Sequence, residues 1–253
     1  MPWEKKVPLL IAHRGMSRQY PENTMPAFEA AVQAGADMIE LDIALSSDGA
    51  FVVIHDDTLM RTTDSSGFVC HYPSDEIVEM DAGHWFGSQP DSIHVPALDE
   101  VLEKIAGRID LNIEVKPFFP LNQSGRMQAA LSRLMTLLDE RGLREQVILS
   151  SVNFYLLEYI RELDPDMRLG LIFRRPLTDF DPVVVCESLR AYSLHPWHVQ
   201  TTAELVQAMH HIGAKVFPYT VNEMPRLRQL MAMGVDGVFT DTPDILRTEL
   251  QAA

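Results

Sequence analysis

The stretch LLIAHRGMSRQYPENTMPAFEAAVQAG, residues 9–35, contains the first of several similar units along this chain. It begins with a short apolar run, typical of a buried strand, and passes through a polar loop. It continues as an amphipathic segment, typical of a helix that begins near Asn23 or Thr24 and ends before Gly35. The stretch therefore predicts one strand–loop–helix unit of an α/β fold.

The same alternation of short apolar runs and longer amphipathic segments continues to the end of the chain. The expected strands are 8–12, 37–44, 110–115, 146–150, 168–172, 190–194, 215–219 and 236–240. The expected helices include 24–34, 98–107, 123–141, 153–163, 201–212, 223–232 and 243–251. Such regular units favour a closed (β/α)8 TIM barrel over an open doubly wound sheet, which would give a similar pattern up to the last strand.

One segment interrupts this alternation. The run LDIALSSDGAFVVIHD, residues 41–56, predicts a hairpin that turns at Ser46–Gly49. Between this hairpin and the helix that begins near residue 98, residues 57–97 show no regular pattern, and a loop of this length is usually functional or a small subdomain. We therefore expect one barrel domain over residues 1–253, with residues 57–97 inserted after its second strand, where they can cover the barrel mouth.

Composition and charge limit the classes of function. The chain of 253 residues is 46% hydrophobic and 23% charged, as expected for one globular domain. Its formal net charge of -15 would repel nucleic acid, so a phosphate ligand must be bound locally. The apolar run near the start, about five residues, is too short for a signal peptide or a membrane span. We expect a cytoplasmic protein without stable membrane association, either alone or as a homo-oligomer.

The two cysteines argue against two further classes. Cys70 and Cys186 are far apart and have no C-x-x-C spacing, which disfavours a disulfide framework or a zinc site.

Polar side chains occur where the expected strands end, and catalytic groups of barrels collect at those ends. They are His13 and Arg14, Glu40 and Asp42, His55 and Asp56, and Glu114 and Lys116. Residues i and i+2 of a strand share a face, so Glu40 projects the same way as Asp42. The same spacing places Glu114 and Lys116 on one face. Gly15, which follows His13 and Arg14, would let a ligand approach the backbone.

Three converging carboxylates would raise one another's pKa unless a cation lay between them. Glu40, Asp42 and Glu114 are therefore candidate ligands of a divalent metal, and an all-oxygen set favours Mg²⁺, Ca²⁺ or Mn²⁺ over zinc. Arg14 and Lys116 are suited to hold a phosphate.

Two histidines are expected to enter this mouth from different loops. Imidazole titrates near neutral pH, so His13 and His55 form a candidate acid/base pair for a phosphodiester. His195 ends a later strand, and His71, His84 and His94 lie in the insertion. Each of these four can be either a structural histidine or one that touches a substrate.

Taken together, these motifs resemble those of the glycerophosphodiester phosphodiesterase family. The blocks occur in the family's order and extend over residues 9 to 246, which is nearly the whole chain. They are AHRG (12–15), PENT (21–24), ELDIALSSDG (40–49), IHDDTLMRTT (54–63), IEVKP (113–117), PYTVN (218–222) and GVDGVFTDTPD (234–244).

The resemblance implies a metal-dependent barrel enzyme. It would hydrolyse small-molecule glycerophosphodiesters to sn-glycerol 3-phosphate and an alcohol. By similarity, the family's functional positions correspond to residues of this chain. They are the metal ligands Glu40, Asp42 and Glu114, the acid/base pair His13 and His55, the phosphate-binding Arg14 and Lys116, and the site-lining Glu22, Asn23, Tyr219 and Asn222. Tyr219 stands where many relatives have tryptophan, which changes the size and polarity of the substrate pocket.

Three questions stay open at this point. A phospholipase-C or lysophospholipase-D type enzyme could use the same barrel, although the acidic composition disfavours a lipid surface. A non-catalytic phosphate-binding module would require at least one of the candidate carboxylates or histidines to be missing, and all of them are present. The reaction could begin with attack by the glycerol 2-hydroxyl, which gives a cyclic phosphate, or by water directly.

Overall fold

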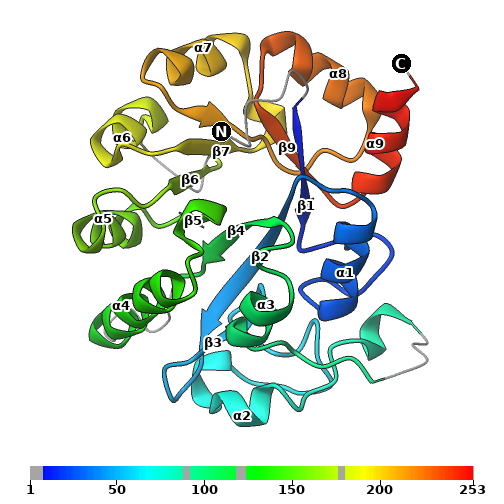
Figure 1. Ribbon diagram of the computed structural model, residues 1–253, viewed down its shortest axis with the longest axis vertical. Helices are drawn as coiled ribbons and strands as arrows, with labels where there is room; N and C mark the ends of the chain where they lie inside the picture. The colour runs from blue at the N-terminus through cyan, green and yellow to red at the C-terminus, as the bar shows by residue number, and fades with distance from the viewer. Residues whose placement is uncertain (1–7, 88–91, 118–123, 176–179, 253) are drawn as a thin grey trace.

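The computed structural model describes residues 8–87, 92–117, 124–175 and 180–252. Strands and helices alternate along these ranges (Figure 1). The strands are β1 (Leu9–His13), β2 (Met38–Leu45), β3 (Phe51–Val53), β4 (Asp110–Val115), β5 (Val147–Ser151), β6 (Leu169–Phe173), β7 (Ser193–Pro196), β8 (Lys215–Val216) and β9 (Gly237–Thr240). The α-helices are α1 (Met25–Gln33), α2 (Ser74–Ile77), α3 (Leu98–Lys104), α4 (Ser124–Glu140), α5 (Phe154–Leu163), α6 (Pro182–Leu189), α7 (Ala203–His211), α8 (Met224–Met233) and α9 (Pro243–Gln251).

The strands form a nearly closed parallel barrel. Their order is β8-β7-β6-β5-β4-β2-β1-β9, and β3 pairs with β2 in the antiparallel direction outside this path. Backbone hydrogen bonds connect β9 with the end of β8, because Asp236 donates to Val216 and Phe239 donates to Pro218. Figure 1 shows the helices on the outside of this ring. The predicted TIM barrel with an excursion after its second strand is confirmed.

The interior of the barrel is apolar at one end and polar at the other. Leu9, Ile11, Met38, Ile148, Phe217 and Phe239 form an inner core cluster. Two positions further along β2 the same interior face carries Glu40, which is paired with Asn112 of β4. Because the strands run parallel, all their C-terminal ends meet at the polar end, where a site can form.

Two strand boundaries and one helix differ from the sequence prediction. The strand expected at 190–194 is β7, Ser193–Pro196, because α6 precedes it and ends at Arg190 in a left-handed conformation with φ 48°. Helix α6 is absent from the predicted helices; Asp181 caps its first turn and Pro182 occupies it. The strand expected at 215–219 is reduced to β8, since Pro218 has no N–H for a ladder hydrogen bond.

The segment between β3 and α3 has a small core of its own. Its buried apolar side chains Ile54, Leu59, Val69, Ile77, Ala82 and Val95 cluster with Ala44 of β2 and Val52 of β3. The segment leaves and rejoins the barrel at adjacent points, because Val53 donates a backbone hydrogen bond to Pro96 over 2.8 Å and Val52 bridges to Ala97. Its length can therefore vary with little effect on the pairing of the barrel strands.

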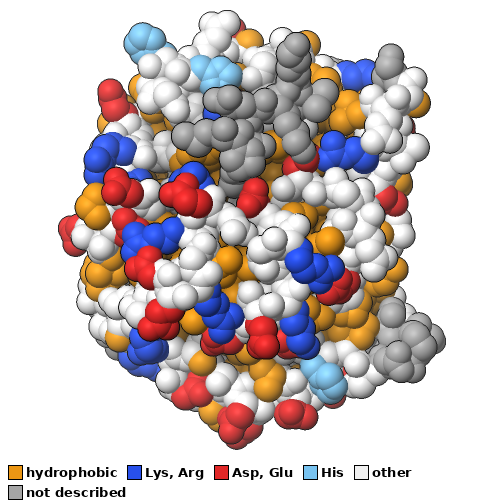
Figure 2. All heavy atoms as spheres, in the orientation of Figure 1, with side chains coloured by type: hydrophobic (Ala, Val, Ile, Leu, Met, Phe, Trp, Pro, Cys, Tyr) orange, Lys and Arg blue, Asp and Glu red, His pale blue; other side chains and the backbone are white. Residues whose placement is uncertain are grey.

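The surface is mixed in charge. On the face drawn in Figure 2, acidic and basic side chains are interspersed, in keeping with many exposed ion pairs such as Arg108 with Glu29 and Lys104 with Glu100. Within the ranges that the structure describes, no helix has both the length and the apolar character to cross a membrane.

Candidate active site

A cavity of about 650 Å³ lies at the polar end of the barrel. Its lining has two kinds of wall. Charged or basic side chains from β1 to β4 and their loops form one side, and mostly neutral or aromatic side chains from β5 to β9 form the other. The charged side includes His13, Arg14, Glu40, His55, Glu114 and Lys116, and the neutral side includes Ile172, His195, Trp197, Tyr219 and Phe239.

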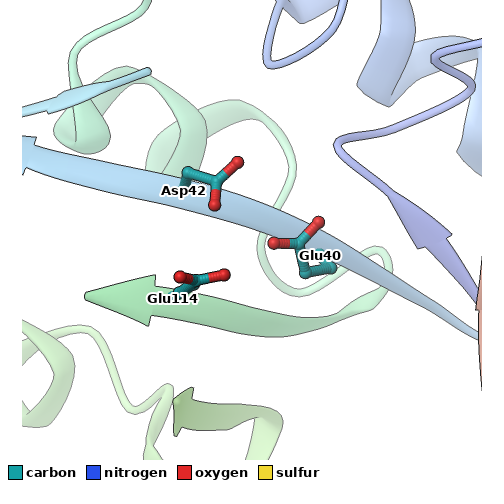
Figure 3. A group of neighbouring side chains, drawn as sticks. All are labelled: Glu40, Asp42 and Glu114. Carbon is teal, nitrogen blue, oxygen red and sulfur yellow. The ribbon is translucent and has the colours of Figure 1, made fainter. Parts of the chain in front are cut away.

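Three carboxylates gather where β2 and β4 lie side by side. Asp42 is directly opposite Glu114 in the parallel ladder, and Glu40 precedes Asp42 by two residues on the same face (Figure 3). One oxygen from each lies within 4.8 Å of the others. Glu40 is only 3% exposed and Asp42 is fully buried. The predicted spacing therefore brings all three carboxylates together.

The electrostatics of this cluster indicate a site for added positive charge. Burial and the neighbouring Asp42 carboxylate raise the pKa of Glu40 well above its usual value. Burial also raises the pKa of Glu114. Burial alone would raise the pKa of Asp42 too, but Lys116 and Arg14 outweigh it and hold that pKa well below the usual range. Three buried carboxylates are costly to ionise at the same time. A hard divalent cation bound between them would favour their charged forms, so the cluster fits such a cation.

Two cations adjoin the same carboxylates. The Lys116 Nζ lies 2.8 Å from an Asp42 oxygen and 2.5 Å from a Glu114 oxygen. The Arg14 Nε lies 3.2 Å from the other Asp42 oxygen, and its Nη1 donates to Glu22 over 2.7 Å. Arg14 and Lys116 both line the cavity, so each can contact carboxylate and ligand.

The loop after β1 is held in an unusual conformation. Arg14 and Asn23 both have positive φ, 56° and 58°, and the Asn23 N–H donates to the Arg14 carbonyl. The Arg14 N–H donates to Glu40 over 2.7 Å, and the Asn23 side chain donates to Asp42 over 2.8 Å. These bonds offset the local strain and fix two of the candidate metal ligands.

Gly15 has a different role from the one expected. A Cβ at this residue would lie 2.7 Å from the Ala27 backbone, and its φ is +81°. Gly15 therefore allows α1 to pack closely against the loop, rather than making room for a ligand.

Each candidate catalytic histidine is held by an aspartate. The His13 Nδ1 lies 2.7 Å from Asp241, and the His55 Nδ1 lies 2.6 Å from Asp56. Such a bond fixes the tautomer and ring orientation and leaves Nε2 as the atom available to a substrate. Burial lowers the pKa of His55, so this imidazole is neutral at pH 7.

The aspartate that holds His13 is itself held by two other side chains. Asn222 donates to Asp241 over 2.7 Å, and Ser17 donates over 3.1 Å. Asn222 lies just before α8, whose N-cap is Glu223. Among the described residues, Asn222 is not part of the cavity wall, and it lies behind the candidate catalytic His13 through Asp241.

A second chain of contacts stands behind His55. Arg61 donates to Asp56 over 2.7 Å and to both oxygens of Glu22 over 2.8 Å. Glu22 thus links Arg61 with Arg14, and this bridging position lies outside the cavity lining formed by the described residues.

The neutral side forms an aromatic wall. Burial raises the pKa of Tyr219 to about 12, so its hydroxyl stays protonated and able to donate. Trp197 contacts the Arg174 guanidinium, which lies 4.9 Å from the ring centroid. Of the other candidate histidines, His195 lines the cavity, and the insertion residues His71, His84 and His94 are outside the part of the lining that is described.

Sequence reasoning did not select Asp241, Arg61, Asn112 or Trp197. Asp241 had a recognisable signal, because it follows the last strand in the block GVDGVFTDTPD. The other three have roles that depend on tertiary contacts, and their residue types alone gave no signal.

Fold and site together define a barrel protein with a cluster of metal-type carboxylates beside the side chains of Arg14 and Lys116. Residues 13–245 match the sequence profile of the Glycerophosphoryl diester phosphodiesterase family. A glycerophosphodiester phosphodiesterase of Caldanaerobacter subterraneus subsp. tengcongensis is 39% identical over 94% of this chain and 96% of its own length. One of Bacillus altitudinis is 34% identical over 93% of this chain and 95% of its own.

A solved structure agrees with these sequence relatives. A phosphodiesterase of Oleispira antarctica, in complex with the product sn-glycerol 3-phosphate, superposes with a TM-score of 0.87. It is 30% identical, and the match covers 97% of both chains. The chain belongs to the glycerophosphoryl diester phosphodiesterase family, and the resemblance seen in its sequence is confirmed.

Proposed function

We propose that this protein hydrolyses glycerophosphodiesters to sn-glycerol 3-phosphate and an alcohol with the help of a divalent cation. The observation that carries the proposal is that a cluster of three carboxylates, two of which line the cavity, converges with two aspartate-held histidines of the same cavity. Family membership and the product-bound Oleispira antarctica relative support the choice of substrate.

Glu40, Asp42 and Glu114 would hold the cation, and their all-oxygen chemistry favours Mg²⁺, Ca²⁺ or Mn²⁺. When bound, such an ion neutralises phosphate charge and polarises a phosphoryl oxygen. Asn23 and the Arg14 backbone N–H position two of these carboxylates. Their contribution is therefore to keep the ligands in place.

Arg14 and Lys116 bind the remaining phosphate oxygens in this proposal. Both line the cavity, and both are held beside Asp42. Glu22 keeps the Arg14 guanidinium in position through its 2.7 Å hydrogen bond. The two cations therefore orient the ester and stabilise charge that grows on it during reaction.

His55 and His13 divide the proton transfers. Because burial lowers the pKa of His55, its Nε2 accepts a proton from the attacking oxygen. Asp241 holds the His13 ring through Nδ1, so that His13 can donate a proton to the leaving oxygen through Nε2. If the glycerol 2-hydroxyl attacks first, a cyclic phosphate forms and water opens it. A 2-deoxy substrate that reacts at an undiminished rate would show direct attack by water instead.

The remaining predictions concern the rest of the chain. We propose that residues 1–253 act as one domain, that residues 57–97 form an accessory insertion, and that Tyr219 faces the alcohol part of the substrate. Asn222 acts through Asp241 rather than by direct contact. The cytoplasmic location and a homo-oligomer stay predictions.

The test is release of glycerol 3-phosphate from several glycerophosphodiesters, with a lysophospholipid as the competing substrate. We expect a chelator or His13→Ala to lower the rate by at least about 10²-fold. His84→Ala, which changes an exposed insertion histidine, is the control and should retain full activity. Full activity in chelator would remove the metal from the mechanism, and a preference for the lysophospholipid would favour the lipid-directed alternative.

A further inference from the structure

Two neutral polar side chains lie in the wall of the cavity below the carboxylates. Asn112 on β4 precedes Glu114 by two residues and shares its face, and His195 lies across the barrel on β7. Both side chains line the cavity, and both residues are 1% exposed. We refer to Asn112 and His195 as the floor pair.

Each member of the floor pair has one polar atom in use and one without a partner. The Asn112 Nδ2 donates to the Ser150 Oγ over 2.9 Å, and the His195 Nε2 lies 2.8 Å from the Ser193 Oγ. The Asn112 Oδ1 and the His195 Nδ1 are buried and have no hydrogen-bond partner among the described residues. Leaving a buried polar atom unpaired costs about 1–3 kcal/mol, so two in one cavity point to a ligand group that pairs with them.

The strand between them is adapted to this arrangement. A Cβ on Gly170 of β6 would lie 2.5 Å from the His195 Cε1 and 3.1 Å from the Ser150 Cβ. The imidazole therefore occupies the space that a side chain of β6 would otherwise fill, and it extends toward Ser150, the partner of Asn112. The absence of a side chain at residue 170 is what lets His195 occupy this position.

The floor pair is uncharged, which limits the ligand group. His195 packs against the Phe239 and Phe217 rings, with centroids 4.8 and 5.7 Å away, and burial lowers its pKa to about 3. A neutral imidazole and an amide oxygen suit a hydroxyl, which both donates and accepts. A phosphate would instead be bound where Arg14 and Lys116 lie.

We propose that Asn112 and His195 bind the terminal hydroxyl of the substrate's glycerol, the one farthest from phosphorus. The inference rests on the proposed function. The enclosed position of the floor pair supports the choice of a glycerol hydroxyl as the bound group. Glycerol is common to all glycerophosphodiesters, so it fits an enclosed polar floor, whereas a variable alcohol fits the open mouth. A substrate without this hydroxyl leaves two buried atoms unpaired, and sites of that kind discriminate strongly.

The experiment compares two chromogenic diesters. Glyceryl p-nitrophenyl phosphate carries the terminal hydroxyl, and 2-hydroxypropyl p-nitrophenyl phosphate lacks only that group. We expect wild type to prefer the first by at least about 30-fold in kcat/KM. Asn112→Leu and His195→Phe, which keep approximate side-chain size, should lower kcat/KM for the glyceryl diester and bring the ratio within about threefold of one. His211→Phe, on the exposed part of α7, is the control.

A second readout does not depend on turnover. Calorimetry of sn-glycerol 3-phosphate and 2-hydroxypropyl phosphate binding should show the same preference in wild type and its loss in the floor variants. Equal losses on both diesters would assign the pair a structural role and overturn the inference. A wild-type kcat/KM ratio near one for the two diesters would also overturn the inference, and this measurement needs no variant. If wild type releases no glycerol 3-phosphate at all, the proposed function fails instead.

Discussion

The half of the barrel mouth built by β1 to β4 differs from the half built by β5 to β9, although both consist of parallel strands with one hydrogen-bonding pattern. The first half carries the carboxylates, both phosphate-type cations and both aspartate-held histidines. The second carries small, aromatic and neutral side chains, with Arg174 at its exposed rim. The three carboxylates that could share one ion come from the adjacent strands β2 and β4, whereas groups that select a substrate by shape need only face it.

The largest expected effect is on the charged half. Glu40→Gln should lower glycerol 3-phosphate release by about 10³-fold, because it removes a candidate metal ligand. The same change should raise the melting temperature in chelator, since the ionised form of Glu40 is disfavoured by burial and by Asp42. Enzyme assays and thermal unfolding test both results. Retained activity with a lower melting temperature would contradict the assignment.

Asp241→Asn tests whether the charged half depends on histidine orientation. We expect kcat to fall by about 10²-fold, because the amide can stabilise the wrong tautomer of His13. Asp236 lies at the opposite end of β9 and pairs with His210, outside the cavity. Asp236→Asn is therefore the control. Equal losses of kcat in the two folded variants would indicate a general effect of aspartate–histidine pairs on stability.

Acidification should lower the free energy of unfolding through His195 in the neutral half. His195 is neutral in the fold with a pKa of about 3, against about 6.5 when unfolded. Its contribution to stability is complete above pH 6.5 and is lost as the pH falls, by up to about 2 kcal/mol at pH 5. His55 acts with the same sign, so the difference between wild type and His195→Phe in urea unfolding isolates His195. Parallel pH curves for the two proteins would refute this account.

The smallest effect concerns selection of the alcohol. Tyr219→Phe removes a hydroxyl from the aromatic wall and keeps the ring. We expect kcat/KM for substrates whose head group carries hydroxyls, glycerol or inositol, to fall by about 3–10-fold relative to kcat/KM for the choline substrate. A change of this size corresponds to the loss of about one hydrogen bond. Competition assays with paired substrates measure this ratio. An unchanged ratio would place the alcohol away from Tyr219.

The charged half was largely predictable from sequence, because spacing along a strand is a local property. Glu40 and Asp42 share a face by alternation alone, and Asp56 follows His55 directly. The partner of His13 was not predictable in this way. Asp241 is 228 positions away, and only the pairing of β1 with β9 brings the two together.

The neutral half and the floor pair gave weaker signals. Asn112 of β4 and Gly170 of β6 are ordinary strand residues until the ladder places them near Ser150. Helix α6 was also absent from the prediction: its valines favour strands, and the Asp181 cap with Pro182 in the first turn begins the helix instead. Long-range packing determined the position of Asn112 and Gly170, and a one-dimensional sequence pattern does not contain such packing.

The backbone link between Val53 and Pro96 has a consequence for how this protein can change over evolutionary time. The stretch it closes off departs from and returns to almost the same place, and has apolar packing of its own. It can therefore be exchanged between relatives as a cassette while the barrel strands keep their pairing. Because His55, Asp56 and Arg61 lie inside this stretch, a chimera joined at Val53 and Pro96 keeps the proposed reaction centre only if it retains these three residues.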